Sequence, residues 1–164
     1  MAKFEFKTDE NGENNMVHAD IVSRTNWDKE LTGDEREVCH TQAALFELCQ
    51  SEYNCDAFDF VTHFMQSDAA ADIDQNVEAY YDVNPFEFIH KLSGKIPSRP
   101  FMEKKNIAAL HWIGYLYRYW ACMGISSKDI IEAIPVTDAY EAYYSLHTLD
   151  IREAIVLLIE RWIK

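Results

Sequence analysis

Apolar residues recur three and four positions apart along most of the chain, which predicts helices. The first helix is expected over residues 31–53, where Thr32 or Asp34 can serve as its N-cap. A second is expected over residues 56–65, and a short third one after Ser67. No segment carries a convincing run of the alternation that strands require.

The stretch GKIPSRP, residues 94–100, is the main break in the helical pattern, with two prolines and a glycine. A fourth helix should precede it, starting at Asn84 and Pro85 and stopping at Gly94. These boundaries predict a loosely ordered N-terminal arm, residues 1–30, followed by one α-helical domain, residues 31–164. That domain divides into an acidic half (31–93), the loop (94–100) and an aromatic core half (101–164).

The longest predicted helix covers residues 101–123 and is apolar on nearly all sides, which places it in the middle of a bundle. Gly114 costs this helix about 1 kcal/mol relative to alanine, so we expect it to permit a close helix approach. Three further helices should start near Ser126, at Thr137 or Asp138, and at Asp150. The predicted fold is an all-α, single-domain bundle of six to eight helices around this aromatic-rich helix.

Charge is distributed unevenly along the chain, whose net charge is −13. Residues 1–90 contain 20 acids and 5 bases, and residues 37–90 contain 11 acids and no lysine or arginine. Such a field repels nucleic acid and anionic lipid and attracts a basic protein, although solubility alone is another interpretation. The predicted acidic surface consists of Asp56, Asp59, Asp68, Asp72, Asp74, Glu78 and Asp82.

Neither a membrane-spanning run nor a secretory signal is recognisable, so we expect a cytoplasmic protein. The four cysteines form no CxxC pair, and the acids around Asp74 lack the glycine and closing glutamate of a calcium loop. No metal or other cofactor is therefore expected. The sequence does not indicate the oligomeric state.

A narrow polar stripe, His111, Tyr115 and Arg118, interrupts the apolar surface of the longest predicted helix. One interpretation is that the stripe faces solvent, or that Arg118 pairs with an internal acid. The other is a groove that meets a partner or a ligand, with His147 nearby. No nucleophile elbow, phosphate loop or metal pair accompanies the stripe, so we assign no catalytic residue and favour a protein that is not an enzyme.

The segments HWIGYLYRYW, GISSKDI and YYSLHTLD, with HFMQSDAAADID upstream, resemble a family of small bacterial all-helical proteins. Its members share a W-x-G-Y-x-Y-R-x-W helix and look like companions of toxin-like proteins, which implies an antitoxin or immunity role. Ala121 and Ile151 depart from the family, which often carries histidine and proline there. The matching positions are Trp112, Gly114, Tyr115, Tyr117, Arg118, Trp120, Ser126, Ser127, His147, Thr148 and Asp150.

Three functional hypotheses follow. The first is an acidic module that binds and restrains a basic protein, with His111, Tyr115, Arg118, His147 and Asp150 as candidate contact residues. The N-terminal arm is the alternative source of specific contacts, and the acidic half would steer the partner. The second is a small-ligand receptor or enzyme whose pocket runs along His111, Tyr115, Arg118 and His147. The third is a nucleic-acid mimic, which would need its acids spaced like phosphates on one face.

Overall fold

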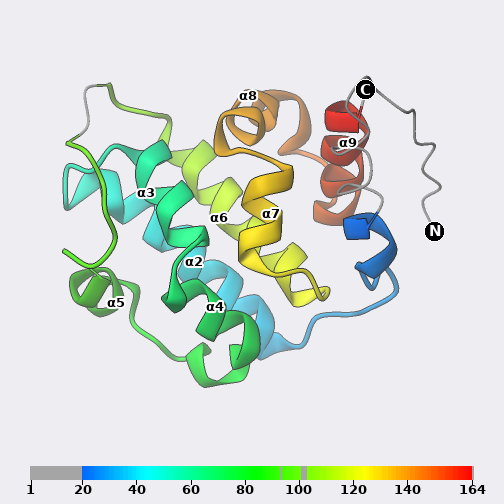
Figure 1. Cartoon of the computed structure of the whole chain (residues 1–164), viewed down its shortest axis with the longest axis horizontal. Coiled ribbons are helices and arrows are strands. Elements are labelled where there is room, and N and C mark those ends of the chain that lie inside the picture. The colour runs from blue at the N-terminus through cyan, green and yellow to red at the C-terminus, as the bar shows by residue number, and fades with distance from the viewer. Residues whose placement is uncertain (1–19, 93, 101–102, 164) are drawn as a thin grey trace.

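Two helices, α2 and α6, lie side by side through the middle of the molecule (Figure 1). The computed structural model describes residues 20–92, 94–100 and 103–163, and in these residues the predicted all-α bundle is confirmed. None of the helices in this part is long and apolar enough to cross a bilayer. The elements are α2 (Gly33–Ser51), α3 (Ala57–Met65), α4 (Asp68–Gln75), the 3-10 helix η1 (Val77–Tyr80), α5 (Pro85–Leu92), α6 (Ile107–Cys122), α7 (Ser127–Ala133), α8 (Val136–Leu146) and α9 (Ile151–Ile163).

The α2–α6 contact depends on Gly114, which faces the backbone of α2. A Cβ atom at this position would lie 2.7 Å from Ala43 Cα and 2.8 Å from the Gln42 carbonyl oxygen. The close approach expected from the sequence is thus confirmed. The large side chains of Tyr117 and Trp120 are fully buried, so α6 forms the aromatic centre of the core.

Side-chain caps fix most helix starts where the sequence placed them. Thr32, rather than Asp34, begins α2 in a capping box with Glu35, and Ser67 begins α4. Glu35 is buried, which disfavours its ionised form. The hydrogen bonds from Lys29 and Thr32 outweigh that effect, so the pKa of Glu35 lies below its ordinary value.

Two expected boundaries are wrong. The helix predicted over residues 101–123 begins only after Asn106, because the Asn106 side chain accepts hydrogen bonds from the backbone of Ala108 and Ala109. At 16 residues α6 is also shorter than α2, which has 19. Helix α8 follows Pro135 with no side-chain cap, where Thr137 or Asp138 was expected.

Residues 20–30 are packed onto the bundle, although the sequence placed them in a loose arm. Residues 20–24 are helical and Ile21 is buried. The Trp120 indole donates to Thr25 Oγ1 at 3.1 Å, and Arg152 donates to the carbonyl oxygens of Trp27 and Lys29. The remainder of the predicted arm, residues 1–19, lies outside the described residues.

We expect Gly114→Ala to destabilise the protein by about 1–3 kcal/mol, because the new methyl group meets backbone atoms that can yield only if a helix shifts. The free energy of unfolding, measured by urea denaturation, tests this. Gly33→Ala is the matched control, since a Cβ there meets nothing within 4 Å. An unchanged urea midpoint for Gly114→Ala would contradict the close-packing account.

Candidate functional site

Arg118 lies in the interior, where it holds an ion pair with Asp74. Its side chain is 1% exposed, and its Nη1 lies 2.5 Å from Asp74 Oδ1. Its Nε donates to Gln42 Oε1 at 2.9 Å and its Nη2 to Ser127 Oγ at 3.2 Å. The guanidinium is therefore matched by three internal acceptors from α2, α4 and α7.

Asp74 completes this network from α4. Its Oδ2 accepts a hydrogen bond from the Ser127 backbone N–H at 2.8 Å, and its Oδ1 accepts one from Ser127 Oγ at 2.6 Å. The Ser127 N–H lies in the first turn of α7, where backbone donors have no partner within the helix. The Gln42 amide in turn donates to the Gly114 carbonyl oxygen at 3.1 Å. Neither Gln42 nor Ser127 was among the predicted contact residues, although Ser127 is one of the positions that match the family in the sequence resemblance.

These contacts correct two sequence assignments. Arg118 was predicted to contact a partner and Asp74 to lie on the acidic surface, but the two side chains form an ion pair inside the fold. The Asp74 side chain is only 14% exposed. The alternative that Arg118 pairs with an acid from the acidic half is the one the structure shows.

The other two members of the polar stripe lie apart from this network. His111 Nδ1 is 3.1 Å from Glu47 Oε1 on α2, and the His111 side chain is partly exposed. The Tyr115 ring meets the His40 ring edge-on at 5.0 Å between centroids, and burial is the main factor that raises the Tyr115 pKa. Helical spacing placed both residues near Arg118, but each contacts a different side chain of α2.

His147 and Asp150 lie at the α8–α9 junction. The His147 ring stacks on Tyr143 at 4.4 Å, and Asp150 Oδ2 accepts the backbone N–H of Arg152 at 3.1 Å as the cap of α9. Among the described residues, no hydrogen bond or ion pair joins His147 to Gln42, Asp74 or Ser127. The pocket hypothesised along His111, Tyr115, Arg118 and His147 thus does not form around a shared space, because Arg118 is enclosed in the packed core.

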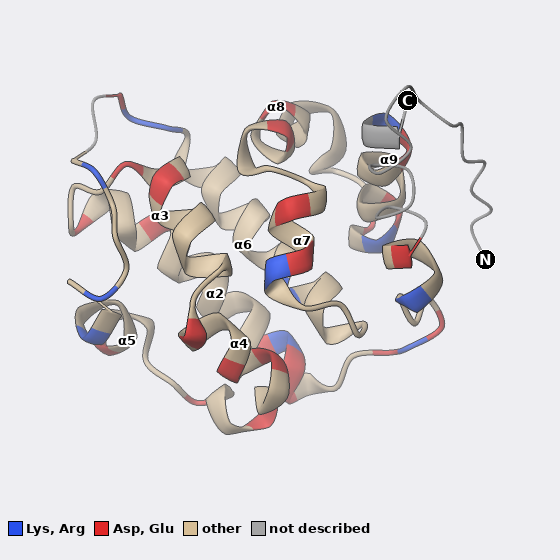
Figure 2. Ribbon diagram, viewed as in Figure 1, with Lys and Arg blue, Asp and Glu red and all other residues tan. Residues whose placement is uncertain are grey.

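The remaining predicted acids fall into two groups. Asp56 caps α3, and Asp59 accepts the Arg99 backbone N–H at 2.9 Å, so both are partly buried and engaged. The exposed group lies on α4, η1 and the residues that follow, where Figure 2 shows acidic positions gathered. Its members are Asp68, Asp72, Glu78 and Asp82.

Two large aromatic side chains are exposed within the same segment. Tyr81 is 47% exposed and Phe86 is 60% exposed. Phe86 borders a hollow of about 570 Å³ that is also lined by Glu52, Glu87, His90 and Lys91. We call the exposed acids and rings of residues 68–87 the acidic aromatic face; its members are Asp68, Asp72, Glu78, Tyr81, Asp82, Phe86 and Glu87.

Sequence reasoning missed these two rings. The available signal is that each ring directly precedes an acid, Tyr81 before Asp82 and Phe86 before Glu87. No group of three or more histidine, cysteine, aspartate or glutamate side chains is placed to hold a metal ion in the described part of the chain.

We expect Arg118→Met to destabilise the protein by about 3–5 kcal/mol, because it leaves the Asp74 carboxylate inside without its cation. Arg99→Met is the control: Arg99 is 77% exposed and 3.8 Å from Asp59, so its loss should cost less than about 1 kcal/mol. Urea denaturation measures both. An equal decrease in the free energy of unfolding for the two variants would show that the buried ion pair stabilises the fold no more than an exposed one.

Comparison with models of known protein families, with curated proteins and with solved structures gives no match. Function is therefore inferred from the residues of this chain and their geometry.

Proposed function

We propose that this protein is an acidic interaction module that binds and restrains a basic protein partner through its acidic aromatic face. The observation that carries the proposal is the coincidence of exposed carboxylates and two exposed aromatic rings within residues 68–87. This segment lies within the longer stretch, residues 37–90, that has no lysine or arginine.

Most of the negative charge in this segment stays at the surface. Asp74, which Arg118 neutralises, is the exception. Asp68, Glu78 and Asp82 are exposed and have no ion pair within 4 Å among the described residues. Their field can raise the association rate of a positively charged protein before any contact is made.

The aromatic rings add apolar contact area and cation–π contacts to the electrostatic attraction. Exposed Tyr and Phe rings can anchor a partner by burying apolar area, and they can accept an arginine guanidinium over the ring face. Carboxylates beside the ring can then pair with the same guanidinium. An arginine-rich surface is therefore the partner chemistry that this face fits best.

The nature of the partner follows from the sequence resemblance rather than from geometry. A companion of toxin-like proteins would bind a toxin in the bacterial cytosol and block its active surface. In this proposal the module acts by occupying that surface and performs no chemistry itself.

The first test compares two triple variants of equal net charge. Asp68→Asn/Glu78→Gln/Asp82→Asn should weaken binding of a fluorescein-labelled arginine-rich peptide about tenfold, since each exposed pair contributes up to about 1 kcal/mol. Asp28→Asn/Glu132→Gln/Glu153→Gln, which removes exposed acids elsewhere, should change it little. Fluorescence anisotropy at low salt measures both affinities, and an equal effect of the two triples would mean that only net charge matters.

The second test concerns the aromatic anchor. We expect Phe86→Ser to weaken binding of the same peptide at least about threefold while the melting temperature stays close to that of the wild type, because the ring is mostly exposed. Tyr144→Ser is the control, because Tyr144 is 72% exposed but lies on α8. If Tyr144→Ser weakens binding as much as Phe86→Ser, the anchor is not on the proposed face.

A further inference from the structure

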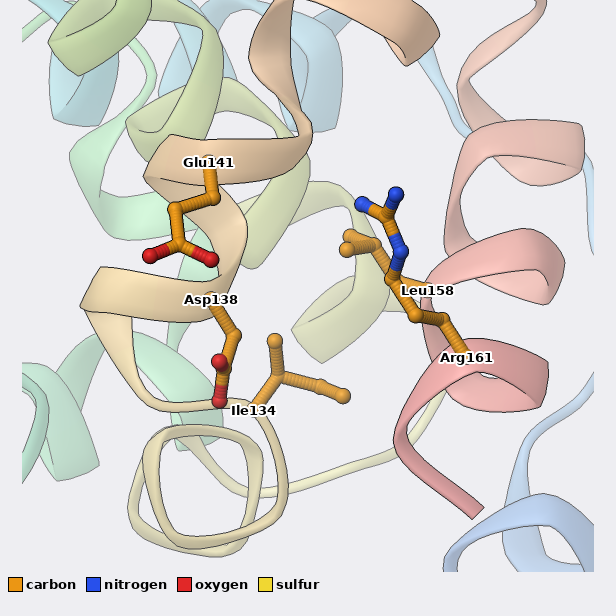
Figure 3. Close-up of a pocket in the computed structure, with 5 residues that line it drawn as sticks. All are labelled: Ile134, Asp138, Glu141, Leu158 and Arg161. Carbon is orange, nitrogen blue, oxygen red and sulfur yellow. The ribbon is translucent and has the colours of Figure 1, made fainter. Parts of the chain in front are cut away.

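A cavity of about 430 Å³ lies between α8 and α9 (Figure 3). Its lining includes two buried apolar side chains, Ile134 and Leu158, which are 1% and 2% exposed. Its polar lining consists of Asp138 and Glu141 from α8 and Arg161 from α9. The volume is within the range of small-molecule sites, about 300–1,000 Å³.

Side chains of opposite charge line this cavity from its two helices. Figure 3 shows Asp138 and Glu141 on α8 and the Arg161 side chain extending from α9 into the space between the two helices. Within the described residues, no ion pair of 4 Å or less joins Arg161 to either carboxylate. The space between them can therefore receive a molecule that carries both charges.

The charge of the acid pair is compensated only in part. Burial is the main factor that raises the pKa of Asp138, the neighbouring Glu141 raises it further, and Arg161 lowers it only in part. An ammonium group placed between the two carboxylates would relieve this repulsion. The Arg161 guanidinium, whose fork matches a carboxylate, would take the negative end of the same molecule.

We propose that this cavity binds a small zwitterion, with its ammonium group at Asp138 and Glu141, its carboxylate at Arg161 and an apolar body against Ile134 and Leu158. A dipeptide with aliphatic side chains has this chemistry and suits the volume. Helices α8 and α9 lie at the other side of the molecule from α4 and α5 (Figure 1), so this site is independent of the acidic aromatic face.

The test uses three probes with the full chain: the dipeptide Leu-Leu, its C-terminal amide and its N-acetyl derivative. Isothermal titration calorimetry should show that Leu-Leu binds and that each blocked form binds at least about tenfold more weakly, because each has lost one charged contact. Equal affinity for all three probes, or binding of none, would overturn the proposal.

Two variants assign the contacts. Arg161→Gln should weaken the binding of Leu-Leu about tenfold and leave the binding of the C-terminal amide, which is already weak, unchanged. Asp138→Asn should likewise weaken the binding of Leu-Leu about tenfold and leave the binding of the N-acetyl form unchanged. Lys128→Gln, at an exposed position on α7 that does not line the cavity, is the control and should bind Leu-Leu like the wild type. Should Arg161→Gln weaken the amide as strongly as Leu-Leu, the carboxylate contact would be wrong; a normal melting temperature for each variant excludes unfolding as the cause.

Discussion

One buried guanidinium connects four helices of this fold. Arg118 on α6 contacts Gln42 on α2, Asp74 on α4 and Ser127 in the first turn of α7. Removing an ion pair from water costs several kcal/mol per ion, and the cost is offset only when geometry and the remaining hydrogen bonds are good. Here each polar group has a partner, so the network fixes how α4 and α7 sit on the α2–α6 pair.

This network also determines where the acidic segment lies. Asp74 holds α4 against the core, and the residues that follow α4 carry Glu78, Tyr81 and Asp82 to the surface. One acid of the segment is thus used for architecture, while its neighbours stay in solvent. The same stretch of chain can therefore anchor the fold and offer an anionic surface, because successive helical positions point in different directions.

Two surfaces of different character result. The acidic aromatic face consists of exposed carboxylates and two exposed aromatic rings. The cavity between α8 and α9 is enclosed on its apolar side by Ile134 and Leu158 and carries both signs of charge. The first suits recognition of a basic macromolecule, and the second suits a small molecule whose own charges are a few ångströms apart.

The amino-acid sequence alone determined the fold class, most helix positions and the close approach at Gly114. These features depend on local spacing and on caps such as Ser67 and Asp150, whose hydrogen bonds stay within three residues. The sequence did not determine which residue faces Arg118. A helical period gives the direction of a side chain around the helix axis, but not the helix that packs against that side. Only the tertiary structure decided that Asp74, 44 positions away, neutralises Arg118, and that Tyr81 and Phe86 stay exposed. Long-range pairing and burial are properties of the packed chain, and no local pattern records them.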